Sequence, residues 1–318
     1  PPPPPPPPPP PNTHHPPPPT NPLFPYTTLF RSKDDPWCVY MTCFAVHTPI
    51  QTKKDLKAKY EAKEPGELHD SVAMATMIQS VDDGVGRIMA ALDEMGATDN
   101  TAVFFFSDNG GYGPVTDMDP LKGYKGAYYE GGIRVPLFVN WPGVVKGGQR
   151  CAEPVIGVDI FPTFCEIAGV ALPDQPQDGV SLVPLLKGEL DSLGARPLFW
   201  HFPAYLQSYQ RTDQQRDPLF RSRPCSIVRK GSWKLHEYFE DNAFELYNLA
   251  DDIGEENNLA KSNTEKLSEL KGVLSGWRKE IKAPVPSEKN PKYNSEIEQA
   301  ALKGKSGTKK GHNKKNKQ

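Results

Sequence analysis

The sequence lacks any apolar run close to the roughly 20 residues that a membrane helix needs. It also lacks the CxxC spacing of structural metal sites, although it has five cysteines: Cys38, Cys43, Cys151, Cys165 and Cys225. An odd number of cysteines does not favour a disulfide framework. Cys38, Cys43 and Cys165 lie in apolar runs, so we expect them to be buried like small hydrophobic residues. Composition alone leaves the compartment open.

A net positive charge is missing from the body of the chain. The formal net charge is −2, yet residues 303–318 carry seven lysines and no acidic residue, so the remainder is acidic. A nucleic-acid enzyme would carry a basic patch on its folded part. This distribution therefore argues against nucleic acid as a partner, and it predicts that residues 291–318 are a basic disordered tail.

The N-terminal segment is dominated by proline. Residues 1–11 and 16–19 are all proline, and such runs adopt polyproline II rather than joining a packed core. The following stretch, LFPYTTLFRS at 23–32, looks like the translation of a sequencing adapter. We therefore interpret residues 1–35 as a low-complexity, disordered segment outside the fold. The alternative is a genuine Pro-rich linker.

Alternating strand-like and helix-like patterns follow. Residues 39–46 predict a buried strand, 69–95 a long amphipathic helix, 102–106 and 135–141 two further strands, and 159–168 a helix. This order predicts an α/β domain over 36–197, with a mixed, mostly parallel central sheet that is flanked by helices and incomplete. Ligands gather beyond the carboxyl ends of the strands in such sheets.

The character of the sequence changes near residue 198. Residues 226–239 and 244–249 read as short strands separated by turns, and 262–281 as a helix with a leucine stripe. We therefore expect a small α+β subdomain over 198–290, in which one helix accompanies an antiparallel sheet.

Two groups of residues suggest binding sites, one for a metal cation and one for an oxyanion. Asp108 and Asn109 directly follow a predicted strand, and both offer the hard oxygen donors that Ca²⁺ or Mg²⁺ prefers. The alternative is an ordinary turn. Lys125 lies in a glycine-rich loop where its ammonium can face a tetrahedral oxyanion. In the same loop, Glu130 and Arg134 are placed to pair and brace it.

Two histidines are further candidates. His47 follows the first predicted strand, where an imidazole can protonate a leaving group, although a core histidine is equally compatible. His201 lies in LFWHFPAYLQSY at 198–209, an aromatic segment that would suit a pocket where sugar rings stack. A packed seam between subdomains explains the same segment.

The ordered motifs FAVHTP, FFFSDNGG, YKGAYYEGGIRVPLFVNWPG, VDIFPTFCEIAG and DGVSLVPLLKG closely resemble the C-terminal part of the type I, formylglycine-dependent sulfatases of the alkaline-phosphatase-like superfamily. The resemblance implies a sulfuric ester hydrolase. It implies that Asp108 and Asn109 bind one Ca²⁺, that Lys125 binds the sulfate ester and that His47 assists the departing alcohol. It further implies a periplasmic or secreted protein acting on a sulfated glycan or an aryl sulfate.

The sequence departs from the family pattern at the nucleophile. The family forms formylglycine from a cysteine in C-x-P/A-x-R, and none of the five cysteines begins that motif. We therefore expect an N-terminal half of the family to be missing and the chain as given to be inactive. Two alternatives remain: a phosphonate or phosphodiester hydrolase of the same superfamily, and a non-catalytic glycan-binding protein. Zinc enzymes of the superfamily usually have histidine where this chain has Asn109.

Overall fold

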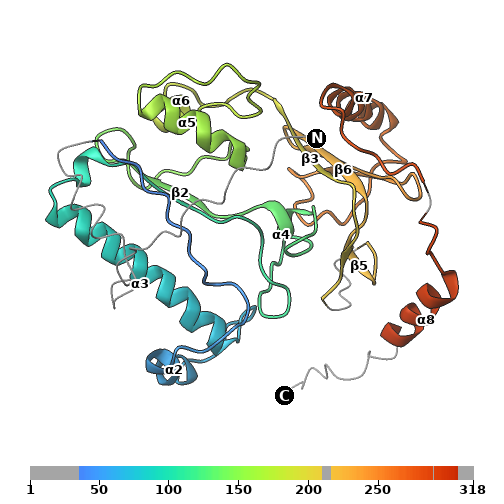
Figure 1. Ribbon diagram of the computed structural model, residues 1–318, viewed down its shortest axis with the longest axis horizontal. Helices are drawn as coiled ribbons and strands as arrows, with labels where there is room; N and C mark the ends of the chain where they lie inside the picture. The colour runs from blue at the N-terminus through green and yellow to red at the C-terminus, as the bar shows by residue number, and fades with distance from the viewer. Residues whose placement is uncertain (1–35, 210–215, 289, 307–318) are drawn as a thin grey trace, which may run out of the picture.

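The computed structural model describes residues 36–209, 216–288 and 290–306 (Figure 1). The helices are α2 (Lys54–Glu61), α3 (Val72–Glu94), α4 (Glu130–Ile133), α5 (Ile160–Ile167), α6 (Val183–Leu186), α7 (Thr264–Glu280) and α8 (Ser295–Ser306). The strands are β1 (Val103–Phe106), β2 (Leu137–Asn140), β3 (Pro197–Phe202), β4 (Leu206–Gln207), β5 (Phe220–Ser222), β6 (Cys225–Lys230), β7 (Trp233–Tyr238) and β8 (Phe244–Asn248). Short 3₁₀ turns precede β1 (Thr98–Asn100) and α5 (Gly157–Asp159).

Strands in the described residues form three sheets. β1 pairs with β2, β4 pairs with β5, and a four-stranded sheet has the order β3-β6-β7-β8. Every one of these pairings is antiparallel. The mixed α/β character is confirmed, whereas the expected parallel pairing is not seen in this part of the chain. The segment 107–136 folds back so that β2 runs beside β1 in the opposite direction, with Val103 opposite Asn140.

Helix α3 matches its sequence signals closely. The Ser71 hydroxyl accepts the Met74 amide at 3.2 Å and caps the first turn. The helix ends before Gly96, whose φ of +65° suits a glycine after the last turn. The strands β1 and β2 and the helix α5 also form where the sequence predicted them.

The strand predicted over 39–46 is wrong. These residues are extended or turn and join no sheet in the described part of the chain. Their large side chains are exposed, 88% for Tyr40 and 71% for Phe44. Cys38 and Cys43 are likewise exposed rather than buried, while Cys165 is buried as expected. An apolar run becomes a buried strand only where a neighbouring strand pairs with its backbone and a layer covers it.

The C-terminal sheet is covered on one face by α7. Val228, Leu235 and Leu246 point from three adjacent strands toward Leu270 and Leu274 of the helix, and all five are fully buried. Burying each such side chain contributes about 1.5–3 kcal/mol. Figure 1 shows α7 beside β3 and β6, and α4 between β2 and this sheet. The antiparallel sheet and its helix confirm the sequence expectation.

The opposite face of the C-terminal sheet packs against the loop before α4. Ala127 and Tyr129 from the loop form an apolar cluster with Tyr247 and Leu249. Because side chains alternate along a strand, the residues of β7 divide cleanly between the two faces. Trp233 and Leu235 pack on the α7 side, and Lys234 and His236 face α4.

Part of the segment expected to be a disordered tail is helical. Residues 295–306 form α8, which begins with Glu296 and Glu298 in its first turn. Acidic residues there complement the helix dipole, and Glu298 also pairs with Arg223 at 3.5 Å. Residues 307–318 and the Pro-rich segment 1–35 lie outside the described residues. Among the helices that are described, none has the length and apolarity that crossing a bilayer requires.

Candidate active site

Two loops that the sequence singled out are joined through their backbones. The Lys125 amide donates to the Gly111 carbonyl, and the Gly110 amide donates to the Gly132 carbonyl, each at 2.9 Å. The first loop carries Asp108 and Asn109 directly after β1. The structure therefore brings the two predicted metal ligands and the loop of Lys125 into one site.

Close backbone contact explains the glycine pairs in these loops. A Cβ atom on Gly110 would lie 1.9 Å from the Gly131 carbonyl oxygen, and one on Gly132 would lie 2.0 Å from the Ala127 carbonyl oxygen. Real Cβ atoms do not approach oxygen so closely. Gly110 thus permits the two loops to dock, since a side chain there would separate them, and Gly132 permits the Lys125 loop to fold tightly on itself.

The polar side chains of this site are accessible. Asp108 is exposed, while Asn109 and Lys125 are half-buried. The Lys125 ammonium forms no ion pair with a carboxylate among the described residues. Two oxygen donors fit the chemistry of Ca²⁺ but supply few of the about six to eight ligands that it takes. Within the described ranges, no group of three or more His, Cys, Asp or Glu side chains is placed to hold a metal.

His47 is exposed, and the contacts of its ring are with neighbours in sequence. Its Nδ1 lies 3.0 Å from the Thr48 carbonyl oxygen, and its ring centroid lies 5.6 Å from that of Phe44. These contacts involve no residue of the loop that carries Lys125, so they do not test the role predicted for His47. Its role toward the leaving group stays a prediction.

His201 is held on the α7 side of the C-terminal sheet. Its Nδ1 lies 2.7 Å from the Ser226 hydroxyl and its Nε2 lies 2.8 Å from the Pro284 carbonyl oxygen. Its ring also approaches Trp277 of α7. Lys125 belongs to the loop on the other face of this sheet, so the contacts favour the packed seam, and we do not propose His201 as a substrate contact.

A buried network of charged side chains links α4, which follows the loop of Lys125, to the C-terminal sheet. The Lys234 ammonium lies 3.0 Å from Glu130 Oε1 and 2.9 Å from Glu255 Oε1, and all three side chains are almost completely buried. Arg134 and Arg229 approach the other oxygen of Glu130, at 3.9 and 3.3 Å. The predicted pairing of Glu130 with Arg134 is confirmed, as the weakest contact of a larger network.

Glu255 ties this network to the backbone of α4. Its Oε2 accepts the Glu130 amide at 2.5 Å, and His236 Nε2 lies 3.3 Å from its Oε1. Burial alone would raise the pKa of Glu255, but the charge of Lys234 and hydrogen bonds from His236 and the Glu130 amide outweigh it and lower the pKa to about 2. Burial also lowers the pKa of His236, so its imidazole is held neutral.

Sequence reasoning missed Lys234 and Glu255. The available signal was a lysine in the middle of WKLHEY, where its neighbours alternate as a strand with both faces covered. A charged residue at such a position is buried only when it is paired. The partner is distant in the sequence, so the pattern does not identify it.

The sulfatase family profile matches residues 6–170, slightly more than half of the chain, and therefore includes both loops of this site. The chain belongs to the sulfatase family. A second profile, N-sulphoglucosamine sulphohydrolase, C-terminal, matches residues 124–280, which include the loop of Lys125 and the C-terminal sheet.

Individual sulfatases show how far the similarity extends. A sulfatase of Formosa agariphila is 35% identical over 280 residues, covering 80% of this chain and 48% of the relative. The steryl-sulfatase of Mus musculus is 34% identical over 194 residues, covering 57% of this chain and 29% of the relative. The chain thus spans about half or less of the length of these relatives.

Solved structures agree with this fold. The structure of Ps i-CgsB in complex with k-i-k-neocarrahexaose has a TM-score of 0.66 and 28% identity, covering 79% of this chain and 52% of that one. A putative sulfatase from Bacteroides thetaiotaomicron, at 20% identity and a TM-score of 0.54, supports the fold alone.

Proposed function

We propose that residues 107–134 form part of the active site of a sulfuric ester hydrolase. The observation that carries the proposal is the backbone docking of the Lys125 loop onto the Asp108–Asn109 loop in a member of the sulfatase family. Lys125 would bind the oxygens of the sulfate group, because its ammonium is accessible and unpaired in the described residues. His47 would assist the departing alcohol, which rests on the resemblance alone.

Asp108 and Asn109 would hold one Ca²⁺ together with ligands from outside the described residues. Their oxygen donors suit a hard cation better than Zn²⁺, which prefers imidazole or thiolate. When bound, the ion would neutralise charge that develops on the sulfate group. The formylglycine nucleophile would also come from outside the described residues.

The substrate class that we propose is a sulfated carbohydrate, with an aryl sulfate as the second candidate. The support is the likeness to Ps i-CgsB, which has been solved in complex with k-i-k-neocarrahexaose. We also propose a periplasmic or secreted location, on the family resemblance alone. A nucleic-acid partner is not part of the proposal, because the chain outside residues 303–318 carries more acidic than basic residues.

Binding of 4-nitrophenyl sulfate to the 318-residue chain, measured by calorimetry in the presence of Ca²⁺, tests this site. Lys125→Ala should weaken binding by about tenfold or more, since it removes a charge-assisted contact. Lys187→Ala is the matched control, because Lys187 is exposed and, among the described residues, pairs only with Glu189 at 3.8 Å. Equal binding by wild type and Lys125→Ala would show that Lys125 does not hold the sulfate group.

We also propose that this chain alone does not turn over sulfate esters, because it has no cysteine in the formylglycine motif. The test is co-expression of residues 33–318 with a formylglycine-generating enzyme, followed by an aryl-sulfate assay. The expected result is no turnover. Measurable turnover that disappears in Asp108→Ala would overturn this proposal.

A further inference from the structure

A third segment reaches Lys125 from the C-terminal subdomain. Arg221, in β5, donates from Nη1 to the Lys125 carbonyl oxygen at 3.3 Å. The β4–β5 hairpin also contacts the next residue of the loop: a Cβ atom on Gly126 would lie 2.6 Å from Leu206 Cδ2. The hairpin therefore borders the candidate site directly.

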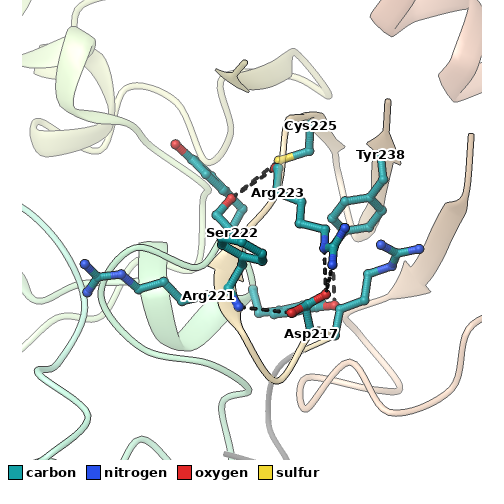
Figure 2. A pocket seen from close by; sticks show the side chains of 10 residues that line it. Asp217, Arg221, Ser222, Arg223, Cys225 and Tyr238 are labelled. Carbon is teal, nitrogen blue, oxygen red and sulfur yellow. Dashed lines mark hydrogen bonds and ion pairs between the residues drawn. The ribbon is translucent and has the colours of Figure 1, made fainter. Parts of the chain in front are cut away.

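Arg221 differs from the other two arginines near this hairpin. Arg216 pairs with Asp241 and Glu245, and Arg223 pairs with Asp217 and Glu240. Arg221 pairs with no carboxylate in the part of the chain that the structure describes. Figure 2 shows its side chain extending away from Asp217 and Arg223. Its positive charge thus remains available on the side of the hairpin that faces Lys125.

Two tyrosines connect the Arg221 side chain to the loop after β1. The guanidinium lies over the ring of Tyr209, 3.7 Å from its centroid. Tyr209 meets Tyr112 edge to face, with ring centroids 4.9 Å apart, and Tyr112 directly follows Gly111, the backbone partner of Lys125. Tyr209 is 42% exposed, so a face or edge of this ring remains open to a ligand.

We propose that Tyr209 and Arg221 bind the neighbouring sugar of a sulfated oligosaccharide whose target sulfate is held by Lys125, and that Arg221 recognises a second sulfate group on it. The proposal deepens, and rests on, the proposed sulfatase function. Aromatic side chains offer large rigid surfaces for the apolar faces of sugars. A guanidinium contacts two oxygens of an oxyanion at once.

The electrostatics of the site favour a substrate with more than one anionic group. Lys125 and Arg221 are cations on adjacent segments, and a half-buried guanidinium without a counter-charge is costly. A second sulfate group supplies that counter-charge, whereas a small aryl sulfate satisfies Lys125 alone. The segment 198–209 therefore contributes to the site through Tyr209 at its end, while His201 is turned toward α7.

The test compares three ligands on the 318-residue chain by calorimetry with Ca²⁺: disulfated and monosulfated forms of one carrageenan oligosaccharide, and 4-nitrophenyl sulfate. Arg221→Gln should weaken binding of the disulfated oligosaccharide about tenfold and change binding of the other two ligands less than twofold. Tyr209→Ala should weaken binding of both oligosaccharides but not of 4-nitrophenyl sulfate. Tyr209→Phe keeps the ring and should bind the oligosaccharides as the wild type does. Arg150→Ala is the charge control, because Arg150 is exposed and belongs neither to the β4–β5 hairpin nor to the loop of Lys125.

Arg221→Lys and Tyr209→Phe keep the test informative if a larger truncation unfolds the hairpin. Arg221→Lys should bind the disulfated and monosulfated oligosaccharides with nearly equal affinity, because lysine keeps the positive charge but lacks the planar guanidinium that contacts two oxygens at once. Two results would overturn the inference while leaving the sulfatase proposal intact: Lys125-dependent binding of 4-nitrophenyl sulfate with no effect of either hairpin variant, or equal weakening of all three ligands by Arg221→Gln. Binding that is independent of Lys125 would contradict both proposals.

Discussion

At the scale of single residues, Lys234 has the most demanding environment in the described chain. Its ammonium is fully buried and lies between the carboxylates of Glu130 and Glu255. Taking a charge out of water costs several kcal/mol, which the two carboxylates offset only while both contacts are made. Lys234 therefore fixes the distance between α4 and the turn that carries Glu255, and indirectly the loop of Lys125.

Replacing Lys234 by methionine should lower the free energy of unfolding by about 3–5 kcal/mol, because two buried carboxylates would then lose the ammonium that lies between them. Urea unfolding of wild type and variant measures the difference. Lys230→Met is the matched control four positions earlier: its pair with Glu269 lies at the surface, with side chains 35% and 39% exposed, so a change of about 1 kcal/mol or less is expected. Similar losses in both variants would contradict this account.

Acid should destabilise the protein through Glu255 and His236. The pKa of Glu255 is about 2 in the fold against an ordinary 4.5, so its stabilisation is complete above about pH 4.5 and is lost as the pH falls toward 2. The lowered pKa of Glu255 stabilises the fold by about 3 kcal/mol, since each pKa unit corresponds to about 1.36 kcal/mol. The lowered pKa of His236 acts in the same direction below about pH 6.5, since the unfolded chain then binds the extra proton.

The free energy of unfolding, measured by urea titration between pH 3 and pH 8, tests this dependence. Glu255→Gln should flatten the part of the profile below about pH 4.5, and His236→Asn the part just below pH 6.5. Glu265→Gln is a suitable control, because Glu265 is exposed in the first turn of α7 and forms no ion pair among the described residues. A wild-type profile that is flat down to pH 3 would rule out the role given to Glu255.

At the scale of elements, the sequence predicts those whose periodicity and end signals agree. Helix α3 combines an amphipathic stripe with Gly96 after its end and forms within the predicted range 69–95, and the structure adds a cap by Ser71 at its start. Residues 39–46 carry an equally apolar pattern but find no strand partner in the described chain. The difference is physical: a helix satisfies its backbone internally, whereas a strand depends on a neighbour that its own residues do not specify.

The same reasoning separates the parts of the candidate site. Asp108, Asn109 and Lys125 are recognisable because short motifs carry them. The docking of their loops depends on Gly110, and their support depends on Glu255, which is 125 residues from Glu130. Contacts over that separation are fixed by the packing of α4 on the C-terminal sheet, and local patterns do not encode them.

Gly110→Ala should separate the two loops, because the added methyl group would lie 1.9 Å from the Gly131 carbonyl oxygen. We expect a loss of about 1–3 kcal/mol in stability together with weaker binding of 4-nitrophenyl sulfate. Gly86→Ala is the contrasting control. It lies in the exposed interior of α3 with open space around it, so it should stabilise the chain by roughly 0.5–1 kcal/mol. Unchanged ligand binding in Gly110→Ala would show that loop docking does not position Lys125.

At the scale of the whole molecule, the β1–β2 ladder is only partly covered: Phe106 is 41% exposed although it lies on the same face as Phe104. Phe104 packs against Phe164 of α5, with ring centroids 5.1 Å apart. Phe105 and Phe138 are cross-strand partners and are 39% and 66% exposed, with centroids 6.1 Å apart. Tyr40 and Phe44 add further exposed rings from the segment before α2. The strand predicted at 102–106 therefore forms, but it is not covered on both faces as expected.

An exposed pair of large aromatic rings on a sheet favours self-association. We expect the wild-type chain to show concentration-dependent association in sedimentation velocity experiments, and the double variant Phe105→Ser, Phe138→Ser to shift the distribution toward the monomer. The matched control is Phe161→Ser: Phe161 is 51% exposed on α5, outside this pair, so its loss should leave the distribution unchanged. Association that persists unchanged in the double variant would show that the contact uses another surface. An equal shift in Phe161→Ser would show a general effect of hydrophobicity rather than a role for this face of the sheet.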